Sequence, residues 1–309
     1  MDQASSLRRI VGNRGGDKRD RKPSNLTGPD GKTRVISITS GKGGVGKSNV
    51  VLNLCLALAK KGKRVFLLDA DMGLANVDVL LGMTPQYTLE HFFSGERTIA
   101  EVVLTGPDNM RILPSGSGIS ELSELTFDQQ QMLFSKLKDL GGEIDYLFID
   151  TGAGISSNVL RFNASAGEVL IVANAEPTSI TDAYALMKLL ATKYQVRHFG
   201  LVANSVNSQA DGQNVYDTLN RVCGQFLQVE LHYLGWIPFD AAMRKAVRSQ
   251  KPVMIGAPTA PAARNLLQIA NWLTIHRIGT PSDSITEPDS ALDSKIQGFW
   301  DRLLHWKKL

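Results

Sequence analysis

Short apolar runs alternate with longer segments of mixed polarity between Arg34 and His276. Runs rich in β-branched residues predict buried strands, and apolar residues spaced three or four apart predict helices with one buried face. The predicted strands are Val35–Thr39, Arg64–Leu68, Met110–Leu113, Tyr146–Ile149, Glu168–Ala173, His198–Ala203 and Leu231–Gly235. The predicted helices are Ser48–Lys61, Asn76–Leu81, Phe127–Leu140, Ser156–Ala164, Ser179–Lys193, Gln213–Phe226, Ala241–Arg248 and Pro261–His276. This alternation predicts an α/β fold: a doubly wound, mostly parallel sheet with helices on both faces.

The pattern changes at both ends of the chain. Residues 1–11 predict a short helix, and residues 12–33 are rich in Gly, Asp, Lys, Arg, Pro and Asn, which is typical of a flexible, basic linker. Either this N-terminal part is a solvated tail or it tethers a helix that folds on a partner. Residues 34–278 form the predicted domain, residues 279–293 form a Pro-containing linker, and residues 294–309 form a final helix.

The final helix is predicted to be amphipathic. At about 100° per residue, its apolar side chains share one broad arc: Ile296, Phe299, Trp300, Leu303, Leu304 and Trp306. Lys307 falls inside that arc, and a lysine near a helix end can extend to the polar side. Two tryptophans, a phenylalanine and basic neighbours suit a membrane interface, so we expect this helix to target a membrane surface. The alternative is a helix that packs against its own domain.

Composition limits the class of protein without identifying it. The chain has 309 residues, of which 43% are hydrophobic, and its net charge of +4 is too small to argue for nucleic acid. Its two cysteines, Cys55 and Cys223, have no metal-ligand spacing, which argues against a disulfide framework, a zinc site or an iron–sulfur cluster. No apolar run approaches the roughly 20 residues that cross a bilayer, and the N-terminus is not signal-like. We therefore expect a cytoplasmic protein with no direct nucleic-acid partner.

One glycine-rich stretch carries the clearest chemistry. Between the first predicted strand and helix, Ser40-Gly41-Lys42-Gly43-Gly44-Val45-Gly46-Lys47-Ser48 fits the pattern G-x-x-x-x-G-K-[ST]. Glycines allow backbone N–H groups to point at phosphate oxygens, and the helix N-terminus adds its positive dipole end. The stretch therefore predicts a nucleoside triphosphate bound by Gly41, Lys42, Gly43, Gly44, Val45, Gly46, Lys47, Ser48 and Asn49. In this motif Lys47 bridges the terminal phosphates and Ser48 is a ligand of Mg²⁺.

Three acidic residues follow predicted strands near this loop. Asp69 and Asp71 come after the second predicted strand, and Asp150 ends a four-residue apolar run. We assign Asp71 to positioning the water that attacks the γ-phosphate, and Asp69 and Asp150 to Mg²⁺ or its waters. The alternative for Asp69 or Asp71 is that it only caps the helix that follows. Gly152 and Gly154 would let the loop after Asp150 respond to a γ-phosphate.

The order of these parts resembles the deviant Walker A ATPases of the MinD/ParA family, from about Arg34 to about His276. The resemblance implies a P-loop NTPase fold, ATP with Mg²⁺, and a nucleotide-sandwich homodimer in which Lys42 reaches the phosphates of the partner. Lys42, Lys47 and Asp71 would then be the catalytic residues. Contacts with the adenine base are implied for four positions around the last strand and for one on the strand before it: Ile237, Pro238, Phe239, Asp240 and Asn204.

Three stretches resemble the flagellar branch of this family, known as FlhG, FleN or YlxH. They are Asp2-Gln3-Ala4-Ser5-Ser6-Leu7-Arg8, residues 73–82 and residues 176–184. This resemblance implies a regulator of flagellar number and placement. It also implies two protein partners: an FlhF-type GTPase, stimulated through Asp2, Gln3, Ala4, Leu7 and Arg8, and a FleQ-type transcription regulator. The ATP dimer would bind the inner face of the cell membrane, and the ADP-bound monomer would be released.

We therefore expect an ATPase that hydrolyses ATP to ADP and phosphate and works as a dimerising switch. Three alternatives stay open: a DNA-binding partition protein of ParA type, a division-site regulator of MinD type, and a nucleotide-binding adaptor with negligible turnover. The basic linker keeps the first alternative open, although the tryptophan-containing final helix fits lipid better than a phosphate backbone. The long N-terminal extension argues against the second, and the cysteine count argues against an iron–sulfur carrier.

Overall fold

The computed structural model describes residues 33–71, 77–114, 127–139, 144–279, 298–300 and 302–303. Its centre is an eight-stranded sheet with the strand order β3-β4-β2-β5-β1-β6-β7-β8. The strands are β1 (Arg34–Ser40), β2 (Val65–Ala70), β3 (Leu104–Thr105), β4 (Arg111–Leu113), β5 (Tyr146–Ala153), β6 (Glu168–Ala173), β7 (His198–Val206) and β8 (Glu230–Pro238). Neighbouring strands are parallel except for the short edge pair β3 and β4. The predicted, mostly parallel sheet is confirmed.

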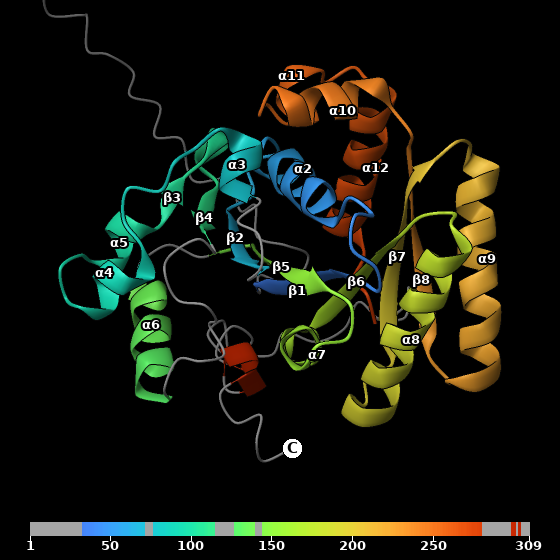
Figure 1. Cartoon of the computed structure of the whole chain (residues 1–309), viewed down its shortest axis with the longest axis horizontal. Coiled ribbons are helices and arrows are strands. Elements are labelled where there is room, and N and C mark those ends of the chain that lie inside the picture. Colours follow the sequence, from blue (N-terminus) through green and yellow to red (C-terminus); the bar gives the residue numbers. More distant parts are fainter. Residues whose placement is uncertain are drawn as a thin grey trace, which may run out of the picture.

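Helices follow most of the strands and cover both faces of the sheet (Figure 1). They are α2 (Lys47–Ala59), α3 (Val77–Leu81), α4 (Leu89–Phe93), α5 (Ile99–Val102), the 3₁₀-helix η1 (Pro107–Asn109), α6 (Phe127–Asp139), α7 (Ser157–Ser165), α8 (Pro177–Tyr194), α9 (Gln209–Phe226), α10 (Ala241–Arg248), α11 (Val253–Gly256) and α12 (Pro261–Ile275). β1 lies near the middle of the sheet, between β5 and β6, and the edge strands are β3 and β8.

Every strand and helix predicted for the domain is present, with ends shifted by a few residues. The sequence pattern missed five short elements, namely α4, α5, α11, η1 and β3. Each has five residues or fewer. A segment of that length makes little more than one helical turn or one pair of strand contacts. It therefore shows no hydrophobic period that could be recognised in the sequence.

The core lies on both faces of the sheet. β1 is buried along its whole length, as expected for a central parallel strand covered on both sides. Because successive side chains alternate between faces, Ile36 and Ile38 pack under α2 and α12, whereas Val35 packs on the face covered by α6 and α7. A third apolar cluster lies under α8 and α9. The sheet therefore separates α2, where the glycine-rich loop ends, from the α6–α7 side.

The described part of the final helix lies on the α6–α7 side. Phe299, Trp300 and Leu303 are buried there, with exposed fractions of 0%, 6% and 5%. They belong to the same apolar cluster as Leu133 of α6 and Phe162 of α7. This packing corresponds to the alternative in which the helix contacts its own domain. The other three residues of the predicted apolar arc, Ile296, Leu304 and Trp306, lie outside the described residues. The residues predicted to dock on a partner also lie outside them: Asp2, Gln3, Ala4, Leu7 and Arg8.

Among the described residues, no helix combines the length and the apolar character that a bilayer span requires.

Candidate nucleotide-binding site

The glycine-rich loop and the acidic residues meet at the carboxyl ends of β1, β2 and β5. These strands are neighbours in the order β2-β5-β1, so their ends share one edge of the sheet. Asp69 of β2 pairs with Asp150 of β5, and Asp150 also pairs with Ile38 of β1. Two residues in direct register point to the same face, so both carboxylates lie on the α2 side of the sheet. Ligands of open α/β sheets bind outside this edge.

The loop is held by contacts with two other parts of the domain and by the conformation of one of its glycines. The side-chain amide of Asn204, at the end of β7, donates to the carbonyl of Val45 over 2.7 Å. The backbone N–H of Gly154 donates to the carbonyl of Ser40 over 2.8 Å. Gly46 has a left-handed conformation with φ of 87°, directly before α2 begins at Lys47. These contacts fix the backbone that the motif needs for aiming N–H groups at phosphates.

Lys47 lies between two carboxylates. Its side chain is 6% exposed, and its Nζ is 2.5 Å from Asp150 Oδ1 and 3.3 Å from Asp71 Oδ2. The Ser48 hydroxyl lies 3.5 Å from the same nitrogen. Asp150 is completely buried, and this burial raises the pKa of its carboxyl, although Lys47 acts in the opposite direction. The structure therefore brings together four residues that the sequence assigned to phosphate, metal and water.

The oxygen donors present fit a Mg²⁺ ion. Asp150 Oδ2 is buried and has no hydrogen-bond partner in the structure, although a carboxylate oxygen can accept more than one bond. Mg²⁺ prefers carboxylate and hydroxyl oxygens, and Ser48 and Asp150 provide one of each. Asp69 is different, because its two carboxylate oxygens accept from the N–H groups of Asp71 and Val77, at 3.2 Å and 3.4 Å. Those bonds match the capping alternative for Asp69; an outer metal role for it stays a prediction.

Lys42 points away from this cluster and contacts α8. Its Nζ lies 2.7 Å from Glu176 Oε2 and 2.9 Å from the hydroxyl of Thr178. The Lys42 side chain is 39% exposed and that of Glu176 is 58% exposed. The bond from Lys42 lowers the pKa of the Glu176 carboxyl. The two lysines of the loop thus lie in different environments, one buried among acids and one at the surface.

The positions assigned to the adenine base have different surroundings in this structure. Ile237 is 1% exposed and belongs to the core. The Asp240 carboxylate accepts from the N–H groups that open α10 and α12, at Ala242 (2.8 Å) and Ala262 (3.0 Å). Phe239 is 55% exposed, and the guanidinium of Arg244 lies over its ring at 4.5 Å. Pro238 ends β8. Base binding by these residues and by Asn204 stays a prediction.

Sequence reasoning missed some roles in this region. Glu176 and Thr178 were selected only as part of a stretch that resembles a family branch, and their contact with Lys42 was not foreseen. Glu176 and Thr178 lie 134 and 136 residues after Lys42 in the chain, so no local sequence signal could reveal these contacts. The bond from Asn204 to the loop was likewise not foreseen. A polar residue at the end of a buried parallel strand is the signal that could have indicated it.

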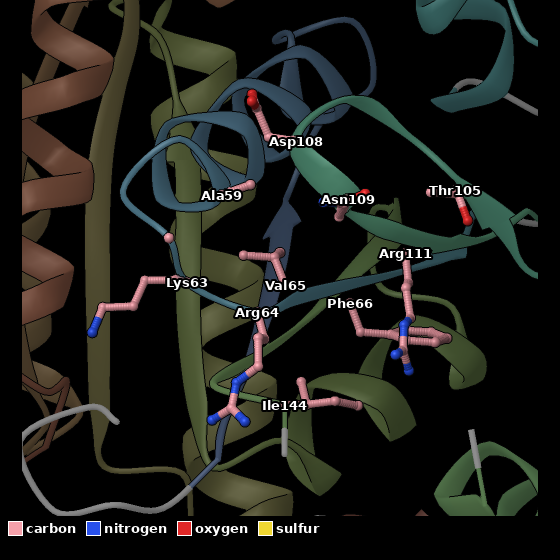
Figure 2. A pocket seen from close by; sticks show the side chains of 11 residues that line it. Ala59, Lys63, Arg64, Val65, Phe66, Thr105, Asp108, Asn109, Arg111 and Ile144 are labelled. Atoms are coloured by element: carbon pink, nitrogen blue, oxygen red, sulfur yellow. The ribbon is translucent and has the colours of Figure 1, made fainter. Parts of the chain in front are cut away.

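A separate pocket lies at the opposite end of the strands. It has a volume of about 540 Å³ and is lined by the end of α2, the start of β2 and η1. Figure 2 shows Arg64 and Arg111 extending along this pocket near Ile144, with Lys63 at its margin. Arg64 forms an ion pair with Asp145 at 2.8 Å. The pocket contains none of the residues of the glycine-rich loop, so it is not part of the nucleotide site.

Comparison with known proteins gives the same assignment as the motifs. A ParA family model, described as NUBPL iron-transfer P-loop NTPase, matches residues 31–274. The antiactivator FleN of Pseudomonas aeruginosa is 46% identical over 230 residues, which cover 74% of this chain and 82% of FleN. The flagellum site-determining protein YlxH of Helicobacter pylori is 34% identical over 285 residues, which cover 92% of this chain and 94% of YlxH.

The fold comparison agrees with the sequence comparison. A chain of the MinC:MinD cell division protein complex of Aquifex aeolicus superposes with a TM-score of 0.63 at 26% identity, covering 81% of this chain and 99% of that chain. The two cysteines of this chain are buried on different helices, Cys55 on α2 and Cys223 on α9. Motif, topology and relatives lead to one assignment. The chain belongs to the ParA/MinD family of P-loop ATPases, in the group that contains FleN and YlxH.

Proposed function

We propose that this ATPase is a dimerising switch that regulates flagellar number and placement. The proposal is supported by the relatives named antiactivator FleN and flagellum site-determining protein YlxH. In this cycle the protein binds ATP as a homodimer at the membrane, hydrolyses it to ADP and phosphate, and returns to the cytoplasm as a monomer. The partners are a second copy of the chain, the membrane lipid surface, an FlhF-type GTPase and a FleQ-type transcription regulator.

The residues around Lys47 perform the hydrolysis. Lys47 leaves Asp150 and Asp71 and binds the terminal phosphates, which carry more negative charge than either carboxylate. Ser48 and Asp150 are the residues that would hold Mg²⁺, and a bound Mg²⁺ would supply positive charge beside the phosphate oxygens. Asp71 is 23% exposed, so a water molecule can reach its carboxylate and be oriented for attack on the γ-phosphate. Each of these steps uses a side chain already at the carboxyl edge of the sheet.

The position of Lys42 is the observation that best supports ATP-dependent dimerisation. Lys42 contacts neither of the carboxylates that surround Lys47, and its side chain lies at the surface beside the loop. A lysine at that position can reach a nucleotide held by a second subunit placed over the loop. The Glu176 and Thr178 contacts hold it on its own subunit until then. Dimerisation thus exchanges one ion pair for a lysine–phosphate contact.

The final helix supplies the membrane contact. In this structure Phe299, Trp300 and Leu303 are buried against the domain, so these side chains are inaccessible to lipid. Binding to a membrane therefore requires that the helix leaves the α6–α7 side. Release in the ATP dimer and return in the monomer would couple the nucleotide to the location of the protein. The N-terminal residues 1–11 would dock on the FlhF-type GTPase in the same dimeric state.

Two single substitutions separate dimerisation from chemistry. We expect Lys42→Ala to bind ATP like the wild type but to stay monomeric in size-exclusion chromatography with light scattering, and to lose turnover. Asp71→Asn should still dimerise with ATP, while its turnover falls by about 10²–10⁴-fold, because the water is no longer positioned. Glu176→Gln keeps Lys42 and removes its ion pair, so it should still dimerise. Wild-type turnover by Lys42→Ala would exclude a role for this lysine in the dimer.

The docking role of the N-terminus has its own test. Deletion of residues 1–10 should leave ATP binding and dimerisation unchanged and abolish stimulation of an FlhF-type GTPase, measured as phosphate release from GTP. Gln3→Ala is a milder variant that should reduce stimulation without shortening the chain. If the truncated protein stimulates the GTPase as well as the full chain does, the docking site lies elsewhere.

A further inference from the structure

Two histidines and a glutamate gather at the amino ends of the last two strands of the sheet. In the register of β7 and β8, His198 pairs with Glu230 and Gly200 pairs with His232. Paired residues on adjacent strands point to one face, and so do residues two apart on one strand. The three side chains therefore occupy three corners of a rectangle on one face of the sheet. Glycine occupies the fourth corner.

The donor atoms of these side chains converge. One nitrogen of each imidazole and one carboxylate oxygen all lie within 4.8 Å of one another. His198 Nδ1 is 3.2 Å from Glu230 Oε2, and His232 Nε2 is 3.5 Å from Glu230 Oε1. The second contact has no hydrogen-bond geometry, so the buried His232 Nε2 has no hydrogen-bond partner in the structure. A buried nitrogen without a hydrogen-bond partner requires an explanation, and a bound ion is one that fits a nitrogen beside a carboxylate.

We propose that His198, Glu230 and His232 form a binding site for one divalent transition-metal ion, and that Zn²⁺ fits it best. Imidazole nitrogen with carboxylate oxygen is a donor set that suits Zn²⁺, whereas Mg²⁺ prefers oxygen donors alone. Zn–N bonds are about 2.0–2.1 Å long, so donors on one tetrahedral ion lie about 3.3–3.4 Å apart. The separations of 3.2 Å between His198 and Glu230 and of 3.5 Å between His232 and Glu230 bracket that value. Water would complete the coordination.

The surroundings prepare two of the ligands. The His232 side chain is only 19% exposed, so its imidazole is largely shielded from solvent. The chain leaving α12 passes over His198: a Cβ at Gly279 would lie 3.1 Å from the Cβ of that histidine. This contact limits the space in which the His198 ring can move. His198 and Glu230 keep exposed fractions of 44% and 54%, which leaves a path for the ion from solvent.

An ion at this position would have a structural effect away from the nucleotide. β8 is an edge strand, bonded only to β7 among the described strands. The three ligands join the amino end of β8 to that of β7, whereas nucleotide chemistry lies at the carboxyl ends of β1, β2 and β5. Metal binding would thus stabilise the pairing of the edge strand β8 with β7 without altering the phosphate loop. The site does not depend on the proposed flagellar function.

The test is a titration of the full chain with Zn²⁺ alone. We expect isothermal titration calorimetry at pH 7.5, without nucleotide and with excess Mg²⁺, to show one saturable site per chain. His198→Gln and His232→Gln should each weaken it at least tenfold. The control is His276→Gln, which removes a histidine whose ring stacks on Trp272 with ring centroids 4.9 Å apart. This variant should bind Zn²⁺ like the wild type. Asp150→Asn should also bind normally, which separates this site from the nucleotide site.

A second measurement guards against a misfolded variant. Saturating Zn²⁺ should raise the wild-type Tm by at least about 2 °C. Glu230→Gln, an exposed position, should fold normally by circular dichroism and lose this rise. If Zn²⁺ gives no saturable heat, or if His198→Gln and Glu230→Gln both bind it like the wild type, the cluster is only a hydrogen-bonded group and the proposal is wrong.

Discussion

At the residue scale, the site keeps a buried charge cluster at a cost to stability. The folded pKa of Asp150 lies above its ordinary value of 3.8, mainly because of burial. A carboxyl with a raised folded pKa stabilises the fold at low pH, and this contribution is lost as the pH rises through that folded pKa. Above that folded pKa the ionised Asp150 destabilises the fold, and Lys47, at 2.5 Å, partly offsets this effect. Such strain is typical of groups kept for chemistry.

Two glycines of the loop offer a matched comparison. A Cβ at Gly41 would collide with the backbone of Asp182 and Ala183 in α8, whereas a Cβ at Gly43 would meet nothing within 4 Å. Backbone cannot move aside as a flexible side chain does. We expect Gly41→Ala to separate the loop from α8, lowering the Tm by several degrees and weakening ATP binding. Gly43→Ala should keep the wild-type Tm, measured by differential scanning fluorimetry; equal Tm values for both would contradict the close approach.

At the element scale, the final helix is held to the domain by more than its apolar side chains. The guanidinium of Arg161 in α7 donates from Nε to the carbonyl of Leu303 over 2.9 Å, and from a second nitrogen to the same oxygen. In the other direction, Arg302 donates to the carbonyl of Ser165 at 3.0 Å and 2.8 Å. Ser165 is the last residue of α7, and the last carbonyls of a helix have no partners within the helix. The two arginines thus connect the helices reciprocally.

Removing one of these arginines should loosen the helix. Arg161→Ala deletes a charged donor, and hydrogen bonds of charged groups contribute about 1.5–3 kcal/mol, roughly a tenfold or greater shift toward the undocked helix. If the helix targets membranes, this variant should bind anionic liposomes without ATP, measured by co-sedimentation. Arg197→Ala serves as the control, because this exposed arginine donates to the side chain of the nearby Gln195 and lies on another part of the domain. Wild-type liposome binding by Arg161→Ala would show that docking does not limit access to lipid.

At the scale of the whole molecule, a buried ion pair connects the centre of the sheet with the chain that leaves it. Arg34 of β1 donates to Glu168 of β6 at 2.8 Å and 2.6 Å, and both side chains are buried. Arg34 also donates to the carbonyl of Leu273 near the end of α12. Glu168 accepts from the N–H of Ile278 at 2.8 Å. One pair therefore fixes β1, β6 and the exit from α12.

Breaking this pair should be far more harmful than removing a surface carboxylate. Glu168→Gln leaves Arg34 buried without its counter-charge, so we expect the free energy of unfolding to fall by about 3–5 kcal/mol in urea denaturation. The double variant Arg34→Met/Glu168→Leu should lose less than the sum of its single variants, because no charge is left buried alone. Asp217→Asn, on the exposed side of α9, should change little. Additive losses would mean that the two residues act independently.

The sequence by itself determined the fold class and most of the chemistry. Alternating apolar runs predicted every strand of the domain except the two-residue β3, because hydrophobic periods are local properties. The spacing of Gly41 to Ser48 and the apolar run before Asp150 predicted a cluster that the structure assembles. These motifs are local because a phosphate loop must be one continuous backbone segment at a helix N-terminus.

Only the tertiary structure decided which distant groups meet. It decided that Lys42 binds Glu176 and Thr178, that Asn204 holds the loop, and that Phe299, Trp300 and Leu303 are buried. It also brought His198 beside His232, through the pairing of β7 with β8. None of these contacts has a sequence period, since each depends on strand order, register and the packing of helices on a sheet. Local patterns set the elements, and long-range packing selects their partners.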